Sequence, residues 1–216
     1  MKRRDFSAVL GLSAVSGLAL AQGAPVEGRH YQRLSQPLPT PPGKVEVLEF
    51  FWYGCPHCFA FDPVLEAWVK QLPADVTFRR VHVGFRANIK LHQRLFYALE
   101  AMGKEAELHA RVFNAFHRDR LNLDDENAIF NLAGTLGLDV AKFKEAYSSF
   151  GVVSKSQQAN KLTDSFRIDG VPSLGIGGRF LTSPSMAGTR NDSEIVLGQR
   201  AVAVADYLIQ LARKGG

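Results

Sequence analysis

The two cysteines of this chain, Cys55 and Cys58, stand two residues apart, where a predicted strand gives way to a predicted helix. Residues Val45–Phe51 before them are β-rich and almost continuously apolar, which is typical of a central strand covered on both faces. Gly54 ends this strand, and residues 55–72 are predicted to form a helix with apolar contacts along it. The chain must therefore fold so that the cysteine pair begins a helix that follows a buried strand.

The cysteine pair has three possible uses: a metal site, a structural bridge or a redox pair. A zinc site needs four ligands and this pair supplies two, while the remaining histidines form no closely spaced pair. A bridge between cysteines so close in sequence closes a very small loop, so its effect on chain entropy is small. We therefore favour the redox pair, with no metal and no cofactor. We expect His82 and His92 to be structural or exposed.

The neighbouring residues indicate the direction of electron exchange. Cys55, at the helix N-terminus, faces the free N–H groups of the first turn, which stabilise a thiolate together with the helix dipole. Pro56 costs the first turn no hydrogen bond, and His57 adds a positive charge or a donor. Because the thiolate exists only in the reduced form, stabilising it makes the disulfide a stronger oxidant. Cys58, one turn further in, is predicted to be the more buried, resolving thiol.

The remaining pattern predicts an α/β fold interrupted by helices. Residues 76–83 follow as a second strand, and the order strand, helix, strand predicts parallel pairing. Residues 88–166 carry apolar side chains at helical spacing. Two later strands flank Gly177 and Gly178, which is a hairpin signal, and Asp192 or Ser193 can cap a last helix. We expect one domain from residues 22–87 and 167–216, with residues 88–166 inserted as a helical domain.

Residues 1–21 are predicted to be a signal peptide. A basic head precedes a short apolar run, and Ala19-Leu20-Ala21 provides an A-x-A cleavage site. The run is too short and too rich in glycine and serine for a stable membrane span. Export by the twin-arginine or the general secretory route places the chain in an oxidising compartment, which we expect to be the periplasm.

The composition excludes nucleic-acid binding as a favoured function. The formal net charge is +5, without a dense basic block or a recognisable nucleic-acid motif. Hydrophobic residues make up 46% of the chain, enough for one substantial core. We expect a monomer without a nucleic-acid partner.

Two motifs resemble those of the DsbA family of thiol:disulfide interchange proteins. The first is Cys55-Pro56-His57-Cys58 after Leu48-Glu49-Phe50-Phe51, and the second is Gly170-Val171-Pro172. The resemblance extends from about residue 30 to the end of the chain. It implies a thioredoxin-like fold interrupted by an inserted helical domain. This family is itself the usual example of an oxidising, low-pKa thiol, so the direction argued above is not independent of it.

The resemblance also implies roles for three residues outside the cysteine motif. Pro172 is expected to be a cis-proline packed against the disulfide, and Val171 to offer backbone hydrogen bonds to a client peptide. Glu49 is expected to be a buried, pKa-tuning carboxylate beside Cys58, since a carboxylate in an apolar strand is costly without a partner or role. The alternative is that Glu49 faces solvent at the strand end.

The chain departs from the best-known pattern of this family at Asp62 and Arg80, where a glutamate and a lysine are typical. The charge signs are kept but the reach of the side chains differs, which affects the tuning of the potential. Trp52 and Tyr53 also differ from the commonest flanking residues and affect the client surface.

The resulting hypothesis is a periplasmic dithiol oxidase that acts on exported proteins through a mixed disulfide on Cys55. The resemblance implies reoxidation by a DsbB-type membrane partner that passes electrons to quinone. A disulfide isomerase or reductase is one alternative, disfavoured because the segment before the first core strand is too short for the N-terminal dimerisation domain of such isomerases. A peptide-binding chaperone with incidental cysteines is the other.

Overall fold

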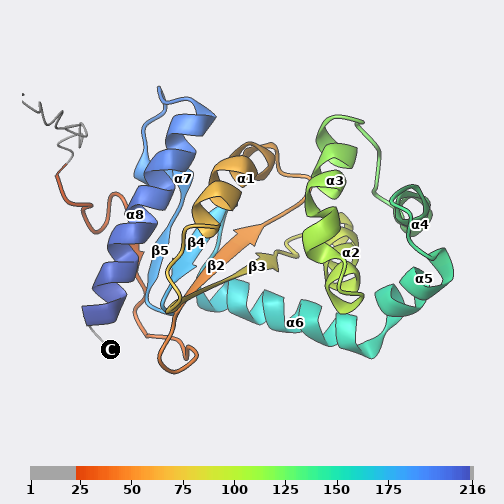
Figure 1. The fold of residues 1–216 in the computed structure, drawn as a ribbon, viewed down its shortest axis with the longest axis horizontal. Helices are drawn as coiled ribbons and strands as arrows, with labels where there is room; N and C mark the ends of the chain where they lie inside the picture. Colours follow the sequence, from red (N-terminus) through yellow and green to blue (C-terminus); the bar gives the residue numbers. More distant parts are fainter. Residues whose placement is uncertain (1–22, 215–216) are drawn as a thin grey trace, which may run out of the picture.

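A five-stranded mixed sheet forms the core of one half of the molecule (Figure 1). The computed structural model describes residues 23–214, and the predicted signal peptide lies outside them. The strands lie in the order β1-β5-β4-β2-β3, with β2 parallel to β3 and antiparallel to β4. Their bounds are Gln32–Arg33 (β1), Val45–Phe51 (β2), Val76–His82 (β3), Ser173–Ile176 (β4) and Phe180–Thr182 (β5).

The predicted parallel pairing and the predicted hairpin are both confirmed. Val45 pairs with Val76 and Phe51 with His82 across β2 and β3. Strands β4 and β5 are joined through Gly177 and Gly178, whose φ angles of 58° and 62° suit a turn that requires left-handed backbone. Two short elements were not predicted from the sequence, namely β1 and helix α7 (Pro184–Ala187).

Helices cover both faces of the sheet, as the apolar sequence of β2 predicts. On one face, α1 (Pro56–Val69) and α8 (Glu194–Lys214) lie side by side (Figure 1) and share an apolar cluster with Val47. On the other face, Phe50 packs against Phe166, the residue that ends helix α6 (Phe150–Ser165), with ring centroids 5.1 Å apart. Alternate residues of β2 therefore point into two different cores.

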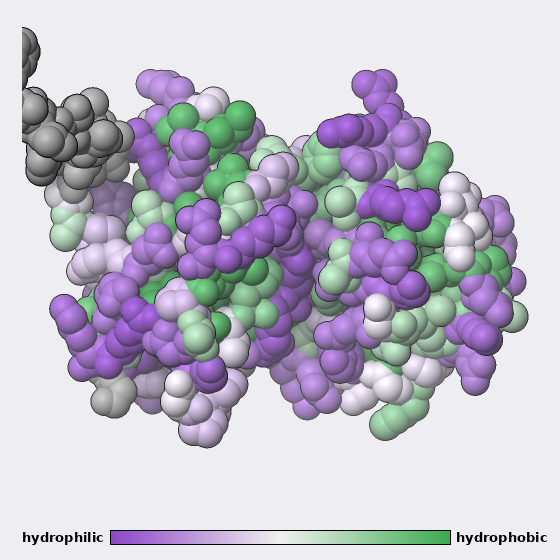
Figure 2. All heavy atoms as spheres, in the orientation of Figure 1, coloured by the Kyte–Doolittle hydropathy of each residue, from purple (hydrophilic) through white to green (hydrophobic). Residues whose placement is uncertain are grey.

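Five helices form the predicted inserted part of the chain, which extends beyond the C-terminal ends of β2 and β3 (Figure 1). Their order begins with two helices that pack on each other and ends with α6, which returns along the sheet and contacts β3. The surface that Figure 2 shows is mixed, with apolar atoms in scattered patches over both halves. The bounds are Ala87–Ala101 (α2), Glu105–His117 (α3), Glu126–Thr135 (α4), Val140–Ser148 (α5) and Phe150–Ser165 (α6).

Helix α8 is the one helix within residues 23–214 that is long and apolar enough to cross a membrane, judged by length and composition. The apolar side of α8 packs against α1 and the sheet, and its residues Ala201, Ala205 and Leu208 are fully buried in the cluster that they share. The predicted cap is also present, since Ser193 Oγ accepts a hydrogen bond from the Val196 N–H at 3.4 Å. We therefore assign α8 as a core helix.

Candidate active site

The cysteine pair lies at the N-terminus of α1, where β2 ends. Cys55 is the N-cap residue, Pro56 is the first helical residue, and the Cys55 Sγ accepts a hydrogen bond from the Cys58 N–H at 3.4 Å. Both cysteines are free thiols, and Cys55 is 6% exposed whereas Cys58 has no exposed surface. The pair therefore has the geometry predicted from the sequence, with one sulfur at the helix end and the other behind it.

The two thiols have opposite pKa shifts. A hydrogen bond with the Cys58 thiol is the largest influence that lowers the pKa of Cys55, to about 6, and it outweighs the effect of burial. The backbone N–H groups of Cys58 and His57 and the charge of His57 lower it further. Burial raises the pKa of Cys58 well above its usual value, and the charges of Cys55 and Glu49 raise it too. Sequence reasoning named the helix terminus and His57, but it did not identify the Cys58 thiol as the main influence.

A second loop brings a cis-proline next to the cysteine pair. The peptide bond between Val171 and Pro172 is cis, as the family resemblance implied, and the Cys55 thiol lies 3.4 Å from the Val171 carbonyl oxygen that accepts its hydrogen bond. Beside this loop is a hollow of about 380 Å³, whose lining also includes Leu181 and Met186. The sequence gives no direct signal of this proximity, since 116 residues separate Cys55 from Val171.

His57 lies at the surface and contacts a residue that sequence reasoning did not identify. Its Nδ1 is 2.8 Å from Oε1 of Glu194, the first residue of α8. The side chains are 65% and 44% exposed, so solvent screens this pair. The contact joins the first turn of α1 to the first turn of α8, 137 residues further along the chain.

Glu49 is fully buried, so the solvent-facing alternative for this residue is wrong. Burial is the main cause that raises the pKa of Glu49, to about 8, although Arg80 opposes the shift. The Arg80 Nε donates to Glu49 Oε2 at 3.0 Å, whereas Glu49 Oε1 has no hydrogen-bond partner. Its charge raises the pKa of Cys58, which places Glu49 electrostatically beside the inner thiol.

Asp62 and Arg80, the two departures from the family pattern, lie in one buried cluster with Glu49. Arg80 also contacts Glu66, and its Nη1 is 3.5 Å from Glu105 Oε1. The Arg80 Nη2 is 3.3 Å from Asp62 Oδ1. Asp62 is shorter than the glutamate typical of the family, and Arg80 is longer than the typical lysine. The two side chains still make contact, so the longer arginine compensates for the shorter aspartate.

His82 and His92 have structural roles, as expected. Burial lowers the pKa of His82 to about 3, so its ring is neutral, and the ring accepts from the Tyr53 N–H at 3.3 Å. His92 Nδ1 accepts from the Trp52 indole N–H at 2.9 Å. These two rings hold the residues that lead into the cysteine pair.

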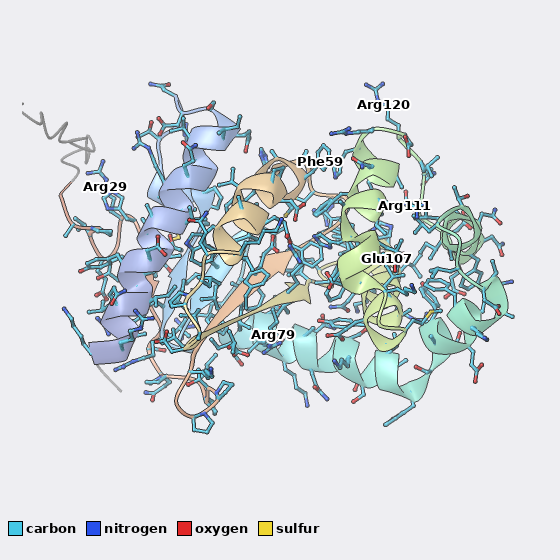
Figure 3. The ribbon with its side chains drawn as sticks, in the orientation of Figure 1. Arg29, Phe59, Arg79, Glu107, Arg111 and Arg120 are labelled. Carbon is cyan, nitrogen blue, oxygen red and sulfur yellow. The ribbon has the colours of Figure 1, made fainter. Side chains whose placement is uncertain are left out.

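An aromatic contact links the helix of the cysteines to the helical part of the chain. Phe59 lies between α1 and α3 (Figure 3), and its ring stacks on His117 with centroids 4.7 Å apart. His117 Nε2 lies 2.8 Å from the Tyr53 carbonyl oxygen, which accepts its hydrogen bond. Among residues 23–214, no group of three or more His, Cys, Asp and Glu is arranged to hold a metal ion.

A helix-capping cysteine pair beside a cis-proline, on a thioredoxin-like sheet, is typical of the thiol:disulfide oxidoreductases. The family model for the DSBA-like thioredoxin domain matches residues 46–191. Thiol:disulfide interchange protein DsbA of Burkholderia cepacia is 40% identical over 188 residues, which cover 86% of this chain and 89% of that protein. The corresponding protein of Pseudomonas aeruginosa strain PAO1 is 34% identical, with coverage of 99% and 98%.

Solved structures agree with the sequence comparison. The crystal structure of Pseudomonas aeruginosa DsbA matches with a TM-score of 0.80 at 35% identity and covers 88% of this chain and 95% of that one. The chain therefore belongs to the DsbA family and has its thioredoxin-like fold with an inserted helical domain. It is a thiol:disulfide oxidoreductase.

Proposed function

We propose that this chain is a periplasmic dithiol oxidase that donates a Cys55–Cys58 disulfide to newly exported proteins. The observation that carries the proposal is the place of Cys55 at the N-terminus of α1, where its Sγ accepts a hydrogen bond from the Cys58 N–H while the Cys58 side chain is fully buried. This arrangement lowers the pKa of Cys55 to about 6 and raises that of Cys58. A thiolate that is stable on Cys55 favours the reduced pair, and so favours transfer of the disulfide to a client. The predicted signal peptide supports the periplasmic location.

The exchange proceeds in two steps that conserve electrons. A client thiolate attacks the Cys55 sulfur, the Cys55–Cys58 bond breaks, and Cys58 leaves with the electron pair. Glu49, protonated below its pKa of about 8, is suited to supply the proton that Cys58 takes up. A second client thiolate then attacks the client sulfur of the mixed disulfide, and Cys55 leaves as a thiolate. The client gains one disulfide and the cysteine pair gains two electrons.

The cis-proline loop is the proposed binding site for the client backbone. Val171 and Pro172 lie against Cys55, and the hollow beside them accommodates the chain that flanks a client cysteine. Pro56 and His57 form the exposed part of the cysteine motif, next to the bond that is attacked. Glu194 holds His57 by the contact at 2.8 Å.

Two further proposals concern the whole chain. The reduced pair is reoxidised by a DsbB-type membrane protein that transfers the electrons to quinone, with the chain acting as a monomer. The thioredoxin-like domain comprises residues 22–87 and 167–216 and the helical domain residues 88–166, a division supported by the position of helices α2 to α6.

The proposal is tested by trapping the intermediate in cells. A Cys58→Ala variant lacks the thiol that would attack a mixed disulfide on Cys55. Mixed disulfides of Cys55 with clients and with the reoxidant should therefore accumulate. We expect several adducts that disappear on reduction, and none in the matched variant Cys55→Ala. If Cys55→Ala forms the same adducts, or if Cys58→Ala forms none, the assigned roles are wrong.

A further inference from the structure

Trp52 contacts the cysteine motif through both its backbone and its ring. Its carbonyl oxygen accepts a hydrogen bond from the Cys55 N–H at 2.9 Å. Its indole ring lies against Gly54, so closely that a Cβ at that position would be 2.3 Å from the ring atom Cζ2. Gly54 immediately precedes Cys55, and both Trp52 and Gly54 are partly exposed. The indole therefore presents surface next to the residue whose sulfur a client thiolate attacks.

The orientation of this indole is fixed by His92, on α2. The Trp52 Nε1–H donates to His92 Nδ1 at 2.9 Å, and His92 Nε2 lies 2.9 Å from the Leu123 carbonyl oxygen. An indole nitrogen can only donate and a carbonyl oxygen can only accept, so the His92 ring carries its one proton on Nε2. Burial lowers the pKa of His92, in agreement with a neutral ring. Two hydrogen bonds in series thus hold the indole to the helical part of the chain.

The surface that the Trp52 ring offers is apolar. Its one polar atom is already paired with His92, so the exposed part of the ring has no donor left for a polar client group. Two other partly exposed aromatic rings lie close by. Phe116 packs on His92 with ring centroids 4.8 Å apart, and Phe59, between α1 and α3 (Figure 3), directly follows Cys58. A client side chain gains most from this surface when it is itself apolar.

We propose that Trp52 is a specificity-determining residue that packs against an apolar side chain flanking the client cysteine, with His92 as the positioning residue that holds the ring. The inference rests on the proposed exchange through Cys55. A client sulfur bonded to Cys55 brings the client residues on either side of it into reach of Gly54 and Trp52. A ring that is oriented before binding loses little conformational entropy when the client arrives.

The test compares two reduced dithiol peptides whose cysteines are flanked by leucine in one and by serine in the other. Each rate constant for oxidation by the chain is divided by that of the same peptide with oxidised glutathione, which corrects for differences in thiol reactivity. We expect the wild-type chain to prefer the leucine peptide about tenfold, because partial burial of a leucine side chain has an effect of this size. In Trp52→Ala this ratio should fall at least threefold.

Trp68 provides a matched control for this substitution. It is the other tryptophan of the chain, it is also partly exposed, and its indole N–H also bonds a side chain, Asp206, at 2.8 Å. It lies near the opposite end of α1 from Cys55, so Trp68→Ala should leave the ratio at the wild-type value.

Two results would overturn the inference. One is a wild-type chain without preference for the leucine peptide, and the other is a Trp52→Ala variant that is slower with both peptides but keeps the same ratio. If the wild-type chain oxidises neither peptide, the proposed function fails instead.

The role of His92 is tested through the mobility of the ring it holds. In a Trp68→Phe background, Trp52 is the one remaining tryptophan, and its fluorescence anisotropy reports how firmly the indole is held. His92→Leu should lower this anisotropy and the leucine-to-serine ratio together. When it is added to Trp52→Ala, His92→Leu should not change the ratio further. A ratio that stays at the wild-type value in His92→Leu, or that falls again in the double variant, contradicts the role of His92.

A measurement with Trp52 unsubstituted applies even if its variants fail to fold. In Cys58→Ala, the Cys55 thiolate attacks the leucine peptide, whose cysteine is activated as a disulfide with 2-thiopyridine. The peptide sulfur bonds to Cys55, and the thiopyridine leaves with the electron pair. Nuclear Overhauser effects should then connect the leucine methyl groups with the Trp52 ring and not with the Trp68 ring. Their absence at Trp52 would contradict the inference.

Discussion

Glu49 has no exposed surface, and its carboxyl group shares one arginine with three other carboxylates. Burial raises its folded-state pKa to about 8, so folding favours the protonated form. A carboxyl group whose pKa is raised by folding stabilises the fold while it is protonated in both states. This contribution diminishes as pH rises from the unfolded value, near 4.5, through about 8.

We therefore expect the free energy of unfolding of the reduced wild-type chain to fall between pH 5 and pH 9 by about 4 kcal/mol more than that of Glu49→Gln. Glutamine resembles the protonated carboxyl group and has no proton to lose. Urea denaturation across this range measures the difference. Parallel pH dependences for the two proteins would show that Glu49 ionises normally.

Among single residues, the sequence predicted the roles of those whose partners lie next to them in the chain. Cys55, Pro56, His57 and Cys58 are consecutive, and a helix N-terminus places the first sulfur without tertiary information. The partners of Glu49 and Asp62 could not be predicted in this way. Arg80 and His109 come from other elements, 31 residues beyond Glu49 and 47 residues beyond Asp62, and only the packing brings them together.

Among the elements, the β4–β5 hairpin directly follows the cis-proline loop, and its turn depends on Gly178. Gly178 has a φ of 62°, and its carbonyl oxygen accepts from the Leu38 N–H at 2.8 Å. A Cβ at this position would collide with the Leu38 carbonyl oxygen. The turn therefore needs glycine for its backbone angle and for close approach of another segment.

We expect Gly178→Ala to lower the free energy of unfolding by about 3 kcal/mol, from the left-handed backbone and the collision together. Gly103→Ala is the matched control, since Gly103 has a φ of 65° with no atom within 4 Å of an added Cβ. It should cost about 1 kcal/mol. Thermal or urea unfolding of both variants measures the two losses in the free energy of unfolding. Equal losses would contradict a close approach of another segment at Gly178.

The regular elements were predictable because their apolar spacing and turn residues are local signals. The apolar sequence of β2 and the glycine pair of the hairpin both led to elements that the structure contains. Strand β1, of two residues, and helix α7, of four, have no such periodicity. Strand β1 exists because Gln32 and Arg33 pair with the edge of β5, which is a tertiary event.

On the scale of the whole molecule, the redox pair lies where the sheet, α1 and α3 meet. Tyr53, before the pair, contacts Phe113 of α3 with ring centroids 5.1 Å apart, and its hydroxyl lies 3.0 Å from His109. The cis-proline loop reaches Cys55 from the later part of the chain. The sequence predicted both parts of the fold, but the way in which α3 closes over the carboxylate cluster required the structure.

The oxidising strength of the disulfide can be measured by equilibrating the cysteine pair with reduced and oxidised glutathione at pH 7 and determining the reduced fraction. The low pKa of Cys55 and the high pKa of Cys58 predict that glutathione reduces the pair readily, with a potential above about −200 mV. The family is known for this behaviour, so the value tests whether this chain shares it. A potential as low as that of thioredoxin, about −270 mV, would contradict the account.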